Sequence, residues 1–154
     1  MFGELGQNIP EGMIPNDYDT QAYLMDLKTR DVTPISREFA PSIQSAIWHK
    51  QSGDIIFKAV DGEYERLFRF SPDAGSYQQL NSGIDVVNAV DIADNGTVAA
   101  YYGSSASMPH KAYILDLKGN QNRLLADPSK SDFQHVRFGK VDRWLFQNEH
   151  QGLR

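Results

Sequence analysis

Three features of the sequence predict an all-β fold. A unit of about 45 residues recurs along the chain, most clearly in three apolar runs that end in a turn, at residues 22–27, 67–72 and 112–117. The aromatic residues of these runs are spaced 45 apart, at Tyr23, Phe68 and Tyr113. Short apolar runs alternate with turn-forming residues throughout, and long helical patterns are missing.

A fixed period between about 40 and 50 residues, filled with short strands, is typical of β-propeller blades. We therefore predict that residues 1–154 form one partial β-propeller of about three blades, each with four antiparallel strands. The units that make up this propeller are expected over residues 1–36, 43–81, 86–126 and 132–154.

The first unit, 1–36, is expected to hold only the second half of a blade. Its hairpin surrounds Tyr23, and Ile35 closes the second strand. Residues 1–19 are too few, and too rich in Gly and Pro, for two full strands before that hairpin.

The unit 43–81 contains the pattern of a whole blade. Its strands are expected at 43–48, 54–60, 66–71 and 77–80, with turn residues between them. Bulky β-forming residues such as Ile55, Phe57 and Phe68 suit strands that pack on both faces.

The unit 86–126 repeats this pattern. Its strands are expected at 86–90, 97–102, 111–117 and 123–125, and the first two are joined by a hairpin signal, Asp94-Asn95-Gly96. Two residues more than in the preceding unit are expected in a longer loop over 103–110. The last unit, 132–154, is expected to begin with strands at 133–137 and 144–146.

About three blades are fewer than the roughly four to eight of closed propellers. A blade cannot bury its faces alone, so an open ring exposes an apolar face that mediates association or aggregation. We expect the chain either to be part of a longer protein or to self-associate through its open blade faces.

Composition excludes several classes of partner. Fifteen basic residues against twenty acidic ones give a net charge of −5, with no basic stripe for nucleic acid. No run of about 18 apolar residues is present, so no membrane span is expected. The chain has no cysteine, and residues 1–6 lack the pattern of a secretory signal, which leaves the compartment open between cytoplasmic and periplasmic or secreted.

The sequence contains no catalytic, metal-binding or cofactor motif. The serine-rich run 103–107 lacks the second Gly of a nucleophile elbow. The histidines form no i,i+4 pair, so we interpret them as surface or blade-packing residues: His49, His110, His135 and His150. We therefore predict no catalytic residue, no metal site and no cofactor.

Glu63 and Glu65 are the only candidates for substrate binding. They flank Tyr64 beside a Gly turn, where two carboxylates could hold the amino terminus of a peptide through charge-assisted hydrogen bonds. The alternative interpretation is a pair of solvated acids next to a turn.

Three segments carry a family resemblance. The run 101–117, with its small-residue loop and its Ala-Tyr-Ile-Leu-Asp-Leu hairpin, resembles the propeller of prolyl oligopeptidase-type serine peptidases, in the dipeptidyl-peptidase and acylaminoacyl-peptidase branches. The segment 66–72 resembles the matching hairpin of another blade, and 138–148 is similar to the segment that precedes their α/β-hydrolase domain.

The resemblance implies a parent serine exopeptidase or oligopeptidase whose propeller admits and orients peptide substrates. The catalytic triad of that family lies in the hydrolase domain, which this sequence does not contain, so no activity is expected of the chain alone. The double-glutamate amine anchor of the dipeptidyl peptidases has no convincing match, because Glu63 and Glu65 are not in a comparable helical insertion.

Two other functions stay open. The chain could be a stand-alone binding module resembling the periplasmic propellers with Ser-Pro-Asp-Gly repeats, which residues 71–75 and 93–96 half-fit. It could also be a partial ring that assembles with further copies of itself.

Overall fold

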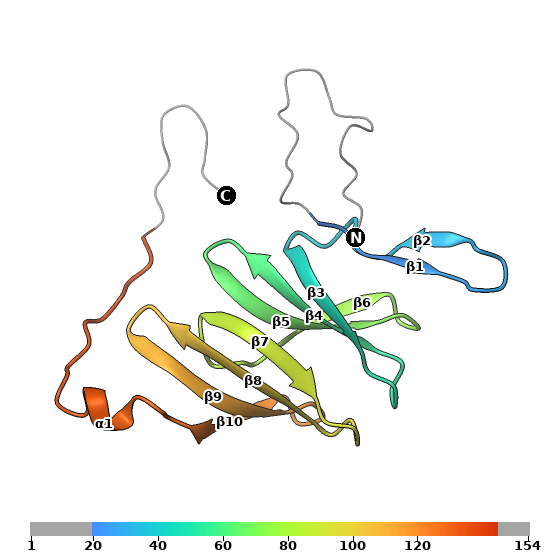
Figure 1. Ribbon diagram of the computed structural model, residues 1–154. Helices are drawn as coiled ribbons and strands as arrows, with labels where there is room; N and C mark the ends of the chain where they lie inside the picture. Colours follow the sequence, from blue (N-terminus) through green and yellow to red (C-terminus); the bar gives the residue numbers. More distant parts are fainter. Residues whose placement is uncertain (1–19, 145–154) are drawn as a thin grey trace, which may run out of the picture.

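The computed structural model describes residues 20–144 and confirms the predicted fold class, since nearly all of its regular elements are strands (Figure 1). A two-stranded hairpin comes first and pairs β1 (Tyr23–Met25) with β2 (Val32–Pro34). Two four-stranded antiparallel sheets follow it along the chain. Among the described residues, no helix is long and apolar enough to cross a membrane.

The first of these sheets, which we call blade 1, is formed by four consecutive strands, each antiparallel to the one before. They are β3 (Ser42–Trp48), β4 (Ile55–Asp61), β5 (Tyr64–Ser71) and β6 (Ser76–Leu80). The second sheet, blade 2, has the same order. Its strands are β7 (Val86–Ile92), β8 (Val98–Ser105), β9 (Met108–Asp116) and β10 (Gln121–Ala126).

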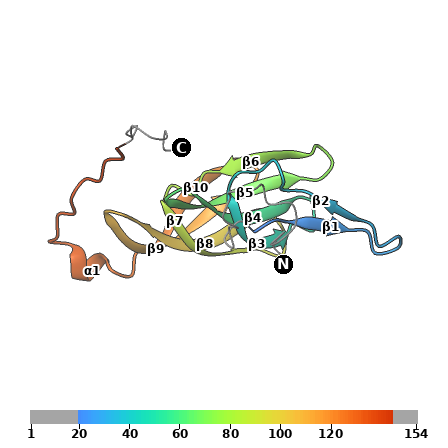
Figure 2. The same cartoon turned by 90° about the horizontal axis from the view of Figure 1, so that it is seen from above.

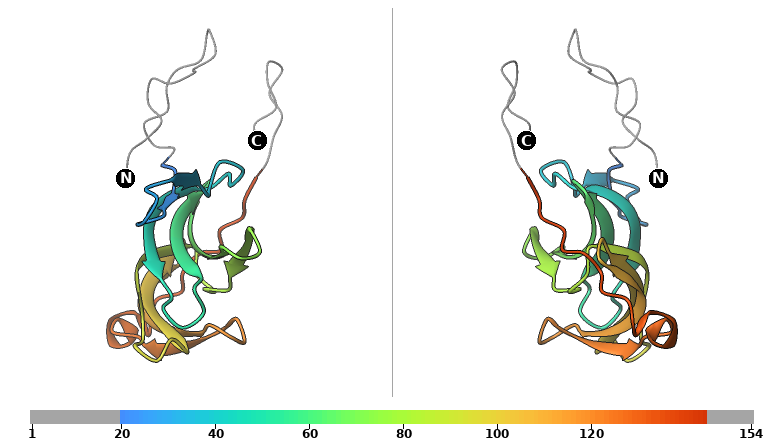
Figure 3. Two further views of the ribbon diagram at one scale, coloured as in Figure 1. Left: turned by 90° about the vertical axis from the view of Figure 1, so that its right-hand side faces the viewer. Right: turned by 90° about the vertical axis from the view of Figure 1, so that its left-hand side faces the viewer.

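The two blades lie side by side (Figures 1 and 2). Their backbones pair at a single parallel position, Glu65 with Val86, so side-chain packing rather than a continuous ladder joins them. The hairpin β1–β2 lies at one end of this arrangement, and β10 and the short helix α1 (Lys130–Phe133) lie at the other (Figure 3).

Two apolar clusters form the core. The first lies between the hairpin and blade 1, and its buried members are Phe39, Ile43, Ile55, Phe57, Ala59, Phe68 and Phe70. The second lies between the blades, and its buried members are Ile56, Leu67, Leu80, Ile84, Val87, Ala99, Tyr101, Tyr113, Leu115 and Leu117. Consecutive residues of β4 enter different clusters because blade 1 is covered on both faces.

The repeat is visible in the backbone as well as in the sequence. The turn after the third strand of each unit contains one residue with positive φ, and these three residues are spaced 45 apart: Arg30 (64°), Gly75 (60°) and Asn120 (51°). The hairpin β1–β2 therefore occupies the place of the third and fourth strands of a blade, as the sequence predicted for its first unit.

The predicted longer loop over 103–110 is wrong. Strands β8 and β9 continue to a two-residue turn at Ala106 and Ser107, because Ser105 pairs with Met108. The next pair is Gly103 with Lys111, so two residues of β9 lie opposite one of β8 in a β-bulge. Pro109 lies within this bulge and has no paired residue on β8, which is a position where a sheet tolerates proline.

Gly103 is required at this point of β8. A Cβ at this position would lie 2.0 Å from the carbonyl oxygen of Val86, which is a backbone atom and cannot move aside easily. The two extra residues of this unit therefore lie in the bulge between β8 and β9, beside the close approach of β7 to Gly103. The spacing of residues alone did not indicate this pairing.

The expected strand at 133–137 is also wrong. The described residues after β10 contain α1 and no strand, and the amide of Phe133 donates to the carbonyl of Ser129 at 3.1 Å. The amide of Val136 likewise donates to Phe133, so the backbone here bonds to itself rather than to a neighbouring strand. Residues 145–154 lie outside the described residues, and the boundaries of the units stay a prediction.

Candidate functional site

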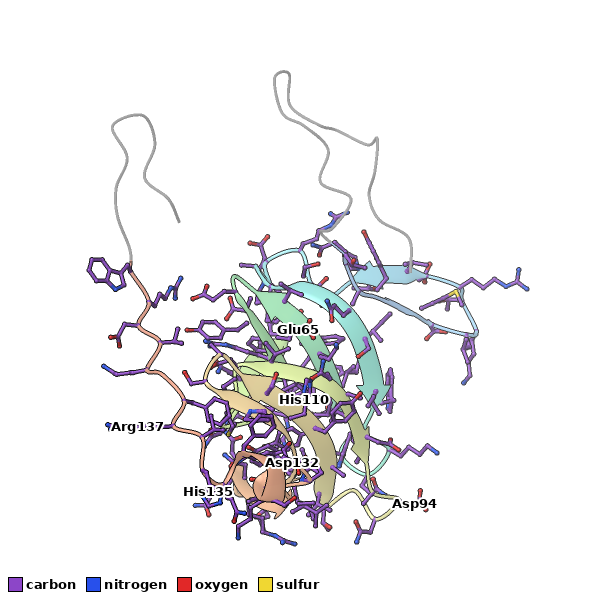
Figure 4. The ribbon with its side chains drawn as sticks, turned by 60° about the vertical axis from the view of Figure 1, so that its left-hand side comes forward. Glu65, Asp94, His110, Asp132, His135 and Arg137 are labelled. Atoms are coloured by element: carbon purple, nitrogen blue, oxygen red, sulfur yellow. The ribbon has the colours of Figure 1, made fainter. Side chains whose placement is uncertain are left out.

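The turn between β4 and β5 carries the two predicted site residues. Asp61 pairs with Tyr64 across a two-residue turn, in which Gly62 has φ of 62° and Glu63 follows it. Glu65 lies in β5 and its carboxylate lies on the side of the strand that faces blade 2 (Figure 4).

Each of these glutamates has its own cation. Glu65 Oε2 lies 2.8 Å from Lys58 Nζ, which also donates to the Asn88 carbonyl of blade 2 at 3.3 Å. Glu63 Oε1 lies 2.8 Å from Arg143 Nε. A peptide amine would have to displace Lys58 from Glu65 or Arg143 from Glu63. Binding of an amine by these two glutamates stays a prediction.

One edge of the blades gathers polar groups around this turn. Asp85 joins its parts, because its carbonyl accepts from the Glu65 amide at 3.0 Å and its amide donates to Ser105 Oγ at 3.1 Å. Its carboxylate accepts from the Ala106 amide at 3.2 Å. We call the β4–β5 turn, the loop 81–85 and the β8–β9 turn together the Asp85 edge.

A polar pocket of about 250 Å³ opens beside the Asp85 edge. It is lined by Tyr64, Arg66, Gln79, Asn81, Ser82, Gly83, Ile84 and Asp85. The Arg66 guanidinium lies 4.0 Å from the centre of the Tyr64 ring and donates to Gln79 Oε1 at 3.1 Å. It also lies 3.5 Å from Asp61 Oδ2, so the guanidinium is held in place and still borders the pocket.

Sequence reasoning missed this pocket. Its walls come from β5, β6 and the loop after β6, and the loop carries no motif. The groups that line it can donate and accept hydrogen bonds and can meet a negative charge through Arg66. They include no pair of nucleophile and base.

The nearest approach to a catalytic triad lies at the opposite edge of the blades. Ser52 Oγ lies 2.7 Å from His49 Nδ1 and 2.8 Å from Asp54 Oδ2. In a triad the histidine lies between the serine and the acid, whereas here the serine lies between the other two. His49 Nε2 lies 2.6 Å from the Gly96 carbonyl oxygen, which can only accept, so this nitrogen carries the proton and Nδ1 accepts from the Ser52 amide.

This cluster holds the blades together instead. His49 and Gln51 come from the β3–β4 loop of blade 1, and they bond to carbonyls in the β7–β8 loop of blade 2, Gln51 to that of Asp94 at 2.5 Å. Arg69 lies 3.7 Å from Asp54 and donates to the Leu117 carbonyl of blade 2. Asp94 and Glu65 therefore mark opposite edges of the blades (Figure 4).

The remaining candidates lie apart. His110 and His135 are exposed, and His150 lies outside the described residues. The serine-rich run 103–107 covers the end of β8 and the turn after it. Within residues 20–144, no three His, Cys, Asp or Glu side chains come together as metal ligands.

Four groups have shifted pKa values that follow from structural contacts, and burial raises the pKa of one of them, Tyr113. Burial raises the pKa of Tyr101, and the neighbouring Tyr113 raises it further. Burial also raises the pKa of Tyr77. The backbone amides of Thr29 and Lys28 donate to the Asp26 carboxylate and lower its pKa. None of these groups lines the polar pocket.

Comparison with known proteins identifies the architecture. A scan against protein-family models gives no match, and neither does a search of curated proteins. The solved structure of TolB from Acinetobacter baumannii matches with a TM-score of 0.53 and 20% identity, over 67% of this chain and 26% of that one. The β-propeller domain of the Trilobed protease from Pyrococcus furiosus, which has an open velcro topology, matches with a TM-score of 0.54 and 17% identity, over 68% and 29%.

This chain is a partial β-propeller. Two blades and a hairpin were described above, and both matching structures are propellers, so the predicted propeller is confirmed. At these identities the matches show the fold alone. The chain spans between a quarter and a third of the length of each matching structure.

Proposed function

We propose that this chain is the non-catalytic propeller segment of a serine peptidase, which admits and orients peptide substrates over a hydrolase domain. The resemblance of segments 66–72 and 101–117 to peptidase propellers supports this function. The match to the propeller domain of a protease is consistent with it.

The observation that carries the proposal is the Asp85 edge. Glu65 and Arg66 lie on β5, which the buried side chains of Leu67, Phe68 and Phe70 anchor in the core, and Glu63 lies in the turn before it. The pocket beside them has a volume of about 250 Å³. A peptide held at this edge would meet charged side chains of both signs, among them Arg66 and the paired carboxylates of Glu63 and Glu65, which suits a zwitterionic chain.

The absence of catalysis by the chain alone is tested directly. The chain is incubated with fluorogenic peptides and with a fluorophosphonate probe. We expect no hydrolysis and no labelled serine. Hydrolysis that the probe abolishes, with the label on a serine of this chain, would show that the segment is itself catalytic.

The orienting role is tested in the full-length product of the gene. Arg66→Gln is expected to change kcat/KM for short peptides by about tenfold or less, the equivalent of one charge-assisted contact. Asp73→Asn, in the exposed β5–β6 turn away from the Asp85 edge, is the matched control and should leave the ratio unchanged. Equal effects of both substitutions would refute a role for this edge.

A second candidate function is a stand-alone binding module. The match to TolB is consistent with it, because that match is one of fold, as is the match to the protease propeller. The two functions predict different further domains in the product of the same gene. An α/β-hydrolase domain with Ser, Asp and His in the triad order of that fold would favour the peptidase segment. A gene product made only of propeller repeats would favour the binding module.

A further inference from the structure

Blade 2 exposes one apolar face. A groove of about 310 Å³ runs over it, lined chiefly by Ala89, Ala100, Tyr102, Ala112 and Leu125. Tyr102 and Leu125 are about half exposed, and the segment 127–144 leaves them uncovered. We call this surface the open face.

The repeat shows which surface would cover the open face. Its residues follow those of blade 1 at spacings of 44 and 45, so Ala100 corresponds to Ile56 and Leu125 to Leu80. In blade 1 these positions are covered by blade 2: Leu80 is 1% exposed, whereas Leu125 is 54% exposed. The open face is therefore one side of a blade–blade interface, and no residue of 20–144 supplies the other side.

The other side of such an interface is present on the hairpin β1–β2. Blade 2 covers blade 1 with residues that include Leu115 and Leu117. The residues 90 positions earlier are Met25 and Leu27. Leu117 is 3% exposed and Leu27 is 83% exposed, so the hairpin presents the covering side chains without a described blade beneath them.

These two surfaces cannot meet within one copy, because the hairpin and blade 2 lie at opposite ends of the arrangement (Figure 3). We propose that a second copy of this chain supplies the partner, so that the hairpin of each copy covers the open face of the other. The contact would continue the packing already seen between blade 1 and blade 2.

The number of copies follows from the blade positions. Within residues 20–144 the hairpin, blade 1 and blade 2 fill three positions, so two copies of this part of the chain fill six, which lies within the roughly four to eight of closed propellers. Three copies would fill nine. A head-to-tail contact that closes after two copies gives a discrete, two-fold symmetric dimer. The tests of this pairing measure mass and cross-linking, not peptidase activity, so the pairing can fail while the proposed function holds.

The mass of the chain in solution is the first test. Sedimentation or light scattering should give twice the chain mass of 17.3 kDa. Tyr102→Glu on the open face and Leu27→Glu on the hairpin should each return the mass to 17.3 kDa with an unchanged circular dichroism spectrum, because both side chains are largely exposed in a single copy. Ala74→Glu, in the exposed β5–β6 turn, is the control and should remain dimeric.

Cross-linking tests the direction of the contact. The chain has no cysteine, so single cysteines can be placed by Met25→Cys and Ala112→Cys in separate preparations. After mixing, a short bismaleimide should give a covalent dimer that contains one chain of each kind. Each variant alone should give little product, and Asp73→Cys mixed with Ala112→Cys should give none.

Either of two results would overturn the proposal. A 17.3 kDa species at tens of micromolar would show that a second copy does not cover the open face. A dimer that cross-links equally well through Met25→Cys alone would show a symmetric contact between hairpins instead.

Discussion

Blade 1 and blade 2 have the same strand order but different surroundings. Blade 1 is covered on one face by the hairpin with Phe39 and on the other by blade 2, whereas blade 2 is covered on one face only. Residues at equivalent positions are therefore buried in one blade and exposed in the other, as Leu80 and Leu125 are. Packing between neighbouring units therefore contributes much of the stability of this molecule, as it does in other repeat architectures.

The largest difference in the free energy of unfolding is expected between the variants Leu80→Ala and Leu125→Ala. Leu80→Ala removes a fully buried side chain from between the blades and should lower the free energy of unfolding by about 2–5 kcal/mol. Leu125→Ala makes the same chemical change at the equivalent position of the open face and should cost about 0.5 kcal/mol or less in a single copy.

Urea denaturation at a concentration where the chain is monomeric measures both effects. Similar losses for the two variants would mean that the open face is covered even in a single copy. A small loss for Leu80→Ala would mean that the interface between the blades adds little to stability.

A smaller difference in the free energy of unfolding is expected when the hydroxyl of either of two buried tyrosines, Tyr101 or Tyr77, is removed. Tyr101 donates to the Ser82 carbonyl between the blades, so Tyr101→Phe leaves a buried acceptor without its donor and should cost about 1–3 kcal/mol. Tyr77, in the cluster between blade 1 and the hairpin, is the buried hydroxyl within residues 20–144 that has no hydrogen-bond partner.

Tyr77→Phe should therefore change the free energy of unfolding by about 1 kcal/mol or less, in the stabilising direction. Thermal and urea denaturation of the two variants give the comparison. A loss of more than that for Tyr77→Phe would show that its hydroxyl has a partner after all.

The same tyrosine makes the interface between the blades sensitive to alkaline pH. The pKa of Tyr101 is higher in the folded chain than in the unfolded chain, because burial and the neighbouring Tyr113 oppose its ionisation. The unfolded chain therefore loses this proton first, so stability is complete below a pH of about 10 and falls as the pH rises above it.

Tyr101→Phe should flatten that fall, and Tyr102→Phe is its control because Tyr102 is half exposed on the open face. Denaturation midpoints between about pH 9 and pH 11 bracket the ordinary tyrosine pKa and measure the slope. An unchanged slope for Tyr101→Phe would assign the alkaline sensitivity to other groups.

The sequence was sufficient to predict the parts of the fold that depend on local pattern. The spacing of Tyr23, Phe68 and Tyr113 predicted the repeat because each lies on the third strand of its unit, at the same position of the pattern. The bulge at Pro109 and the turn of α1 could not be predicted in the same way. They depend on backbone pairing and on local hydrogen bonds that leave no period in the sequence.

The candidate site shows a similar division. Glu63 and Glu65 were visible because they flank a Gly turn, and Lys58, which pairs with Glu65, lies on the adjacent strand of the same hairpin. Arg143, which pairs with Glu63, is 80 residues away and carries no such signal. The contact of His49 with Gly96 spans 47 residues and joins two loops that only the packing of the blades brings together. Such contacts follow from the arrangement of the units, not from the composition of any one unit.

The smallest expected effect sharpens the comparison between the hairpin and blade 1. Arg30 and Gly75 occupy the same left-handed position of equivalent turns, and each amide donates to a carbonyl four residues earlier at 2.8 Å. A left-handed backbone costs an ordinary L-residue about 1–2 kcal/mol, whereas Gly adopts it freely. Arg30→Gly should therefore stabilise the chain by about 0.5–1 kcal/mol, after allowance for the greater freedom of Gly when unfolded.

Gly75→Arg is the reciprocal exchange and should destabilise the chain by a similar amount. Nothing lies within 4 Å of a Cβ built on Gly75, so backbone conformation, not crowding, decides the result. Hydrogen exchange of the amides in β1–β2 and β5–β6 locates each effect. If Arg30→Gly instead loosened the hairpin, the Arg30 side chain would contribute more to the turn than its backbone costs, and the equivalence of the two turns would be limited to their geometry.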